Sequence, residues 1–134
     1  MEYDRAVKHV LFVCNHNAGR SQMAQALFAR AAPEGWVGES AGSSPAAALW
    51  PEVVRVMAEI GIDLSDRVPQ PLTVAMQRRA DHAVTMGCGD ACPFVPAPVE
   101  DWDLPDPAGR PRDEVRAIRD LVARRVDDLV ARLS

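Results

Sequence analysis

Apolar residues recur along this chain in two patterns that alternate, short continuous runs and helical stripes. A continuous run of about four to eight apolar residues is typical of a buried strand, and apolar residues every three or four positions are typical of a packed helix. Their alternation predicts a mostly parallel sheet covered on both faces. The predicted strands cover residues 9–14, 36–40, 81–86 and 99–102, and the predicted helices cover residues 21–32, 51–60 and 113–133.

Prolines and glycines set the ends of several of these elements. Pro33 stops the first helix, Pro51 suits a first helical turn, and Gly61 ends the second helix. Loops are predicted over 41–45, by composition, and over 93–111, where six prolines exclude a long element. The last helix carries an apolar stripe that we expect to be a core face and not a cofactor site. Its members are Val115, Ile118, Leu121, Val122, Val126, Leu129, Val130 and Leu133.

Composition narrows the class of protein. The 134 residues include 15 Lys and Arg and 19 Asp and Glu, spread along the chain, for a formal net charge of −4. This gives no basic patch for nucleic acid. No apolar run has the length of a membrane span, and the charged residues before Val13 are not typical of a secretory signal. We therefore expect one domain over 1–134, a cytoplasmic monomer with a small ligand. Three cysteines in a reducing compartment favour chemistry over structural disulfides.

The most informative segment lies between the first predicted strand and helix and reads Cys14-Asn15-His16-Asn17-Ala18-Gly19-Arg20-Ser21. A turn of backbone N–H groups followed by a helix N-terminus binds tetrahedral anions. We predict that residues 15–19, called the anion loop below, bind an oxyanion, and that Arg20 adds planar donors. The same positive field favours the thiolate of Cys14, in line for attack.

Three residues of this segment suit such a turn. Gly19 allows close backbone approach, Asn17 has a short polar side chain that can brace the turn, and Ser21 can donate a hydrogen bond to the sulfur. The alternative is that Cys14 is a small buried hydrophobe at the end of a core strand.

A second pair of thiols occurs in Cys88-Gly89-Asp90-Ala91-Cys92. In a helical turn their Cα atoms would lie about 6 Å apart, within the disulfide range, whereas an extended segment would hold them too far apart. Gly87 and Gly89 give the segment freedom to change between such states. Two alternatives stay open, a zinc site that includes His82, which would need further ligands, and an unreactive pair in a loop.

The proline-rich loop carries aspartates that could act as an acid. A stiff loop can hold a carboxylic acid over the anion loop, where it would protonate a leaving oxygen. We select Asp106, which precedes Pro107. Asp101 and Asp103 fit the same description, and a solvated turn residue is the alternative for each.

Together these segments resemble the thioredoxin-coupled arsenate reductases, which share the fold of the low-molecular-weight protein tyrosine phosphatases. The resemblance implies an α/β three-layer sandwich with a four-stranded parallel sheet, and it extends from about Val10 to the final helix. It rests on residues 14–21, Ser40-Ala41-Gly42, Val84-Thr85-Met86-Gly87-Cys88 and the Asp106-Pro107 pair.

The resemblance also implies roles. Cys14 would attack arsenate, which Arg20 and the anion-loop amides bind, with Ser21 supporting the thiolate and Asp106 as general acid. Cys88 would then attack Cys14 and release arsenite, and Cys92 would resolve the Cys14–Cys88 disulfide. The expected reductant of the resulting Cys88–Cys92 disulfide is thioredoxin, with a mycothiol or glutathione system as the alternative. Phosphate or sulfate would mimic arsenate.

Two departures from the family pattern change what we expect. Cys88 and Cys92 are closer in sequence than the corresponding cysteines of Bacillus-like members, so any rearrangement between them should be smaller. The positions that align with acidic potassium ligands carry Gln25 and Gln70. We therefore expect no metal, no cofactor and no potassium dependence.

Two other functions fit parts of the sequence. A low-molecular-weight phosphatase acting on phosphomonoesters would use the same anion loop, but would have no use for Cys88 and Cys92. It would also usually carry aromatic residues beside the acid, whereas Ala108-Gly109 follow here and Tyr3 is the single tyrosine. A non-enzymatic arsenite-binding or redox-sensing protein could use the three thiols. It would leave Arg20 and Asp106 unexplained.

Overall fold

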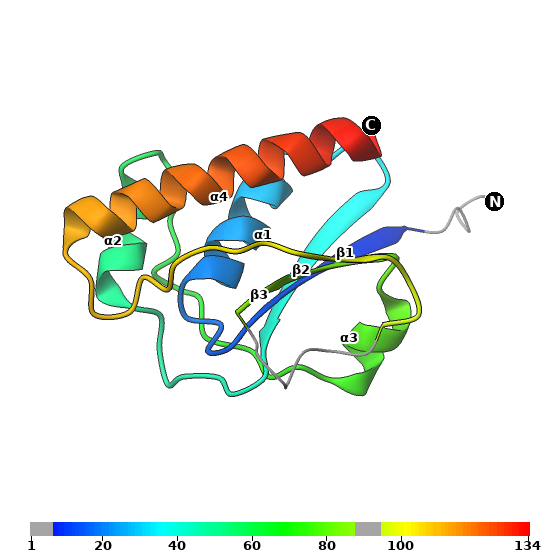
Figure 1. Ribbon diagram of the computed structural model, residues 1–134, viewed down its shortest axis with the longest axis horizontal. Coiled ribbons are helices and arrows are strands. Elements are labelled where there is room, and N and C mark those ends of the chain that lie inside the picture. The colour runs from blue at the N-terminus through cyan, green and yellow to red at the C-terminus, as the bar shows by residue number, and fades with distance from the viewer. Residues whose placement is uncertain (1–6, 88–94) are drawn as a thin grey trace.

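A four-stranded parallel sheet runs through the middle of this computed structural model, which describes residues 7–87 and 95–134 (Figure 1). The strands lie in the order β2-β1-β3-β4, and every pair of neighbours is parallel. The elements in chain order are β1 (Lys8–Cys14), α1 (Arg20–Ala31), β2 (Trp36–Gly42), α2 (Pro51–Ala58), α3 (Val74–Arg79), β3 (His82–Met86), β4 (Val99–Asp101) and α4 (Arg112–Leu133).

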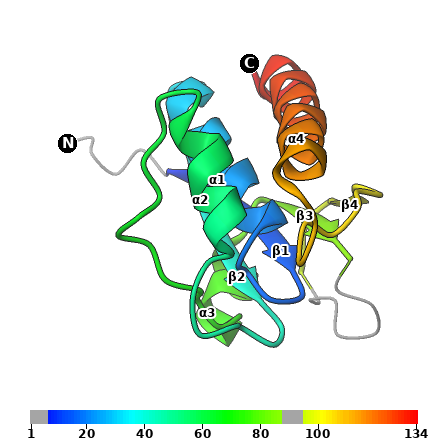
Figure 2. The same cartoon turned by 90° about the vertical axis from the view of Figure 1, so that its left-hand side faces the viewer.

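Helices cover both faces of this sheet and make three layers (Figure 2). α1, α2 and α4 lie on one face, and α3 lies on the other. This arrangement confirms the predicted α/β three-layer sandwich. Among the described residues, no helix is both long enough and apolar enough to cross a membrane.

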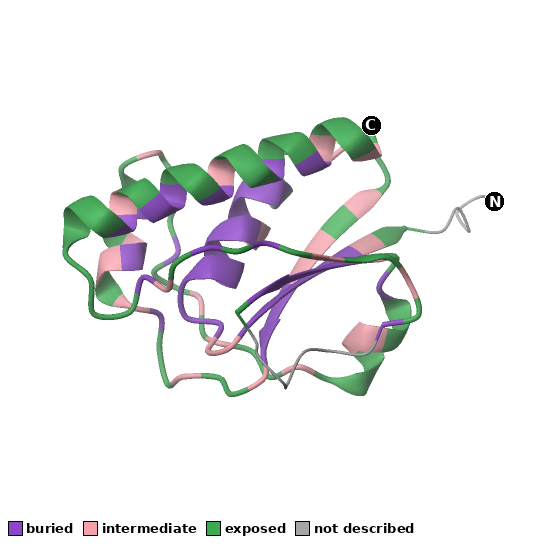
Figure 3. Ribbon diagram, viewed as in Figure 1, coloured by how far each residue is buried: buried purple, intermediate pink, exposed green. Residues whose placement is uncertain are grey.

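The alternation of side chains along β1 places one strand in two cores. Val10, Phe12 and Cys14 belong to the core shared with α1 and α4, whereas Leu11 and Val13 belong to the core on the α3 side. All five are at most 2% exposed, as expected for a central strand of a parallel sheet. Figure 3 shows the same layering, with buried residues on the strands and on the inner side of α4. The backbone that carries Cys14 is therefore held firmly.

Several element ends differ from the prediction for physical reasons. β2 continues through residues 41–42, which were predicted as loop, because Gly42 pairs with Cys14 at the end of β1. α2 ends at Ala58, and Gly61 follows in the left-handed region with φ of 83°.

One residue of the predicted core face of α4 is not buried. Leu121 is 37% exposed.

The short helix α3 is missing from the sequence-based prediction. None of its six residues is buried, so it has no apolar stripe that periodicity could detect. Its local signal is the N-cap, where the Thr73 side chain accepts a hydrogen bond from the Met76 amide at 3.1 Å.

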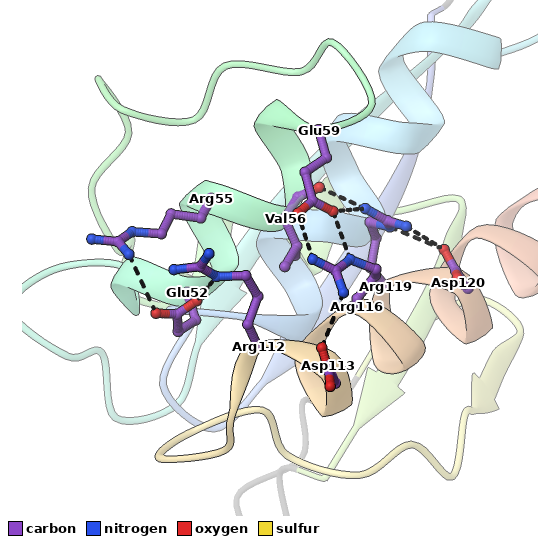
Figure 4. Close-up of polar contacts among 9 residues, drawn as sticks. All are labelled: Glu52, Arg55, Val56, Glu59, Arg112, Asp113, Arg116, Arg119 and Asp120. Carbon is purple, nitrogen blue, oxygen red and sulfur yellow. Dashed lines mark hydrogen bonds and ion pairs between the residues drawn. The ribbon is translucent and has the colours of Figure 1, made fainter.

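Ion pairs join the end of α2 to the first half of α4 (Figure 4). Glu59 accepts hydrogen bonds from Arg116 at 2.7 and 2.8 Å and from Arg119 at 3.0 Å. Arg119 is buried and also donates to the carbonyl oxygen of Val56 at 2.8 Å. One carboxylate therefore holds two arginines of α4 against α2.

This cluster predicts acid sensitivity. The hydrogen bond from Arg116 is the main cause that lowers the pKa of Glu59 from 4.5 to about 2. A carboxyl whose pKa is lower in the folded chain stabilises the fold above its unfolded pKa and loses this contribution as the pH falls through its folded pKa. We expect wild type to melt at a higher temperature than Glu59→Gln at pH 7, and the difference to close between about pH 4.5 and 2.

The matched control is Glu34→Gln, on an exposed glutamate with no ion pair to the described residues. It should leave the melting temperature unchanged across the same pH range. A Glu59→Gln difference that stayed constant with pH would contradict this account of the pair.

Candidate active site

The anion loop begins where β1 ends, at Cys14, and is oriented by a second loop over residues 43–50. Within each trans peptide the C=O and N–H groups point in opposite directions. Because the carbonyls are bound on the side of residues 43–50, the following amides turn the other way. The carbonyl oxygens of Cys14, Asn15, His16 and Ala18 accept hydrogen bonds, at 2.8 to 3.3 Å, from the amides of Ser43, Ser44, Ala46 and Trp50 respectively.

The backbone amides of residues 15–20 make no hydrogen bond to any acceptor in residues 7–87 or 95–134. Several amides of one turn that are unpaired within the described residues, followed by the first turn of α1, are an arrangement suited to an anion. Asn17 lies in this turn with a positive φ of 51°, a conformation that asparagine tolerates better than most residues. The geometry is that of an oxyanion site.

Ser21 lies directly beside the sulfur. Its Oγ is 2.8 Å from Cys14 Sγ, and it accepts a hydrogen bond from Asn17 Nδ2 at 2.6 Å. Because a thiolate can only accept hydrogen bonds, the Ser21 hydroxyl donates to the sulfur when Cys14 is ionised, while Asn17 Nδ2 occupies one acceptor lone pair of the same hydroxyl. Cys14 is 2% exposed and Ser21 is fully buried, so water does not compete for this contact.

Arg20, the first residue of α1, lies between the anion loop and the proline-rich loop. Its Nη1 donates to the carbonyl oxygen of Leu104 at 3.0 Å, and its Nη2 is 3.6 Å from Asp106 Oδ2. The Arg20 side chain is 8% exposed, whereas that of Asp106 is 45% exposed. A carboxyl group is thus held at the mouth of the site, in reach of both the guanidinium and solvent.

The three aspartates that the sequence left open occupy different places. Asp101 accepts a hydrogen bond from Thr85 Oγ1 at 2.6 Å within the β3–β4 pair, and Asp103 is exposed. Asp106 is the one whose carboxylate faces Arg20, and it also accepts from the Ala108 amide at 3.0 Å. The geometry therefore favours Asp106 as the acid.

Gly19 is packed on both sides, which explains why this position has no side chain. A Cβ here would come within 2.7 Å of Pro107 and 3.2 Å of Trp50. The ring of Trp50 meets that of His16 edge-on, with centroids 5.9 Å apart. Trp50 comes from the loop before α2 and was not predicted at the site, because aromatic residues were expected only beside Asp106.

Cys88 and Cys92 lie outside the described residues. The chain reaches them from β3, whose Met86 is paired with Cys14. Gly87 packs so closely against Arg20 that a Cβ at this position would come within 2.6 Å of Nη1. His82, the residue considered for a zinc site, instead lies 2.7 Å from Glu100, with Nε2 facing the carboxylate.

A second row of polar side chains lies behind the anion loop, and the sequence analysis did not assign it to the site. Asn17 Oδ1 accepts from Gln22 Nε2 at 2.9 Å and from the Gln70 amide at 2.7 Å. Arg67 donates to the side-chain oxygens of Gln22 and Gln25. Gln22 had a weak signal, a polar residue inside an otherwise buried helix, whereas the loop of residues 61–73 had none. Gln22, Gln25, Arg67 and Gln70 border a cavity of about 410 Å³.

Comparison with known proteins places this site in a family. The model of the family described as low molecular weight phosphotyrosine protein phosphatase matches residues 9–134. The chain belongs to this family. The resemblance to its fold that the motifs carried is thereby confirmed.

Several named relatives of this phosphatase-family chain are arsenate reductases. A putative arsenate reductase from Halobacterium salinarum is 40% identical over 88% of this chain and 87% of its own. A glutaredoxin arsenate reductase from Synechocystis sp. is 33% identical over 96% of this chain and 100% of its own. The structure of a thioredoxin-dependent arsenate reductase from Corynebacterium glutamicum matches with a TM-score of 0.80 and 40% identity over 93% of this chain. This chain spans 61% of the length of that solved chain.

The contacts of Gln25 and Gln70 bear on the expected indifference to potassium. Gln25 Oε1 accepts from the Arg67 guanidinium, and Gln70 contributes its backbone amide to Asn17. A cation between these groups would meet a positive charge and an N–H donor. We expect the melting temperature to be the same in potassium, sodium and choline chloride at equal ionic strength. A rise specific to potassium would contradict this prediction.

Proposed function

We propose that this protein reduces arsenate to arsenite through a covalent intermediate on Cys14. The observation that carries the proposal is the pairing of the Cys14 sulfur with Ser21, 2.8 Å away, at the base of a loop whose free amides suit a tetrahedral oxyanion. The choice of arsenate over other oxyanions as the substrate is supported by the names of the relatives. We further propose that the protein acts as a cytoplasmic monomer.

In the first step the Cys14 thiolate attacks arsenic and an S–As bond forms. One arsenate oxygen leaves as water, with a proton that Asp106 donates from the mouth of the site. Arg20 and the amides of the anion loop hold the remaining oxygens and stabilise their charge. The product is a Cys14–arsenate adduct with arsenic still in its oxidised state.

In the second step the thiolate of Cys88 attacks the sulfur of Cys14. The S–S bond forms as the S–As bond breaks, and the bonding electron pair stays on arsenic, which leaves as arsenite. Cys92 then attacks Cys88, frees the Cys14 thiolate and leaves a Cys88–Cys92 disulfide. The position of Gly87 against Arg20 supports this order, since the chain enters Cys88 from beside the anion loop.

A thiol reductant must open the Cys88–Cys92 disulfide to complete the cycle. We propose thioredoxin, the reductant named for the Corynebacterium glutamicum relative. The Synechocystis relative carries the name glutaredoxin arsenate reductase, so a glutathione-linked system is the alternative to test beside it.

The deciding experiment follows arsenite release with thioredoxin, thioredoxin reductase and NADPH, with a glutaredoxin–glutathione system in parallel. We expect multiple turnovers with thioredoxin. Without reductant, we expect the protein to lose the mass of two hydrogens, mapped by peptide analysis to Cys88–Cys92. A protein whose mass arsenate leaves unchanged, and which releases no arsenite, would overturn the proposal.

A phosphatase acting on phosphomonoesters is the second candidate, favoured by the Trp50 and His16 rings beside the anion loop. The same sample settles it, because p-nitrophenyl phosphate hydrolysis by a protein that does not reduce arsenate would select the phosphatase.

The role of Asp106 gives a separate prediction. Asp106→Asn keeps the size of the side chain but removes the acid, and we expect the rate of adduct formation to fall about 10²- to 10⁴-fold. Asp103→Asn is the matched control on the same loop and should change the rate little. Equal losses in the two variants, measured by rapid-quench mass spectrometry of the adduct, would contradict the assignment.

A further inference from the structure

A continuous chain of hydrogen bonds connects a guanidinium behind the anion loop to the sulfur of Cys14. Arg67 Nη1 donates to Gln22 Oε1 at 3.3 Å, and Gln22 Nε2 donates to Asn17 Oδ1 at 2.9 Å. Asn17 Nδ2 then donates to Ser21 Oγ at 2.6 Å, and this oxygen lies 2.8 Å from Cys14 Sγ. Four hydrogen bonds thus separate a positive charge from the nucleophile.

The guanidinium of Arg67 fixes the donor-to-acceptor direction of this series of hydrogen bonds. A guanidinium has donors and no acceptor, so the oxygen of Gln22 must face Arg67 and its nitrogen must face Asn17. The same reasoning turns the Asn17 nitrogen toward Ser21. When Cys14 is a thiolate, the Ser21 hydroxyl donates its proton to the sulfur. Because all the donors point the same way, each bond polarises the next.

Burial makes the arrangement stable against exchange with water. Asn17 and Ser21 are fully buried, and Gln22 is 1% exposed. Arg67 is held in place by its own backbone amide, which donates to the Leu64 carbonyl at 3.0 Å, and by a second side-chain bond to Gln25. Arg67 itself is only partly buried at the edge of the cavity, but the hydrogen bonds beyond Gln22 lie in surroundings of low polarity, where polarisation passes from bond to bond more strongly than in water.

Asn17 has a second anchor, the Gln70 amide, which donates to the same Oδ1 at 2.7 Å. The orientation of Asn17 is therefore fixed even without Gln22. Arg67 therefore contributes its charge in addition to orientation. Among the described residues, no other guanidinium or ammonium group donates to Gln22, Asn17 or Ser21.

We propose that Arg67 is a positioning residue for the reaction, whose charge acts through Gln22, Asn17 and Ser21 to hold a hydrogen bond on the Cys14 thiolate. The inference rests on the proposed function only in taking Cys14 as the nucleophile. Arg67 itself contacts neither the sulfur nor the anion loop backbone.

The test measures the thiolate directly and needs neither arsenate nor a reductant. Iodoacetamide labelling of the full chain, with peptide mapping of the Cys14 peptide, gives the rate of Cys14 alkylation from pH 5 to 9. We expect Arg67→Met, which removes the charge and keeps much of the volume, to move the midpoint of this profile to higher pH. At pH 6 the rate should fall about threefold to tenfold, the range for one ordinary hydrogen bond, because the charge acts on the sulfur through three intervening side chains. Arg67→Lys should restore most of it.

Arg30→Met is the matched control, because Arg30 also ties α1 to the segment after α2, donating to the Ile60 carbonyl at 2.9 Å. It should leave the profile unchanged. Gln22→Met interrupts the series of hydrogen bonds but keeps the bond from Arg67 to Gln25. It should shift the midpoint in the same direction. This variant decides the question if Arg67→Met does not fold. A wild-type profile in either folded variant, or an equal shift in Arg30→Met, would overturn the inference. Failure to reduce arsenate with the shift intact would overturn the proposed function alone.

Discussion

Cys14→Ser is expected to abolish arsenate reduction, with arsenite release below about one part in 10⁴ of the wild-type rate. The sulfur forms the only proposed bond to arsenic, and a serine hydroxyl at this position is a far weaker nucleophile. Among the described residues, Ser21 is the side chain that hydrogen-bonds to Sγ, and its hydroxyl is not a base that could activate the new serine. Arsenite released with thioredoxin present, measured over hours, checks the prediction.

Anion binding should survive the same substitution. The backbone amides and Arg20 hold the oxyanion without help from the sulfur, so phosphate should still raise the melting temperature of Cys14→Ser. This separates loss of the nucleophile from loss of the fold. Ser21→Ala is the companion variant, expected to retain slow turnover because it removes one hydrogen bond and leaves the sulfur. Full activity in Cys14→Ser would place the nucleophile elsewhere.

The anion loop could be predicted from the sequence because its groups are local. Eight consecutive residues between a strand and a helix carry the nucleophile, the amides, the arginine and the serine. The end of β1 fixes where this segment begins, and α1 starts at Arg20, one residue before the predicted Ser21.

The support behind the anion loop could not be predicted, because it comes from distant positions. Arg67 and Gln70 reach Gln22 and Asn17 across 45 and 53 residues of sequence. They belong to a loop with no periodic pattern, and only the folded chain brings it against α1. Trp50 was missed for the same reason. Asp106 was separable from its neighbours only after β4 had placed Asp101 within the sheet.

The cysteines beyond β3 give the second prediction of large effect. Cys92→Ser is expected to release about one arsenite per chain and then stop, because no thiol remains to open the Cys14–Cys88 disulfide. Peptide mapping should find these two cysteines joined. Cys88→Ser is the matched variant; it should stop one step earlier, with the arsenic adduct held on Cys14 and no disulfide formed.

The comparison of these two variants tests the order of the thiol relay. Residue 88 follows directly on Gly87, which lies against Arg20, whereas residue 92 is four positions further along. We therefore propose that Cys88, the thiol next to Gly87 in the sequence, attacks Cys14, and that Cys92 makes the exchange with the reductant. Continued turnover of Cys92→Ser with thioredoxin would show that Cys88 passes its disulfide on directly. Continued turnover of both variants with a small thiol alone would show that this thiol attacks the Cys14 adduct, and the three-cysteine sequence would then be wrong.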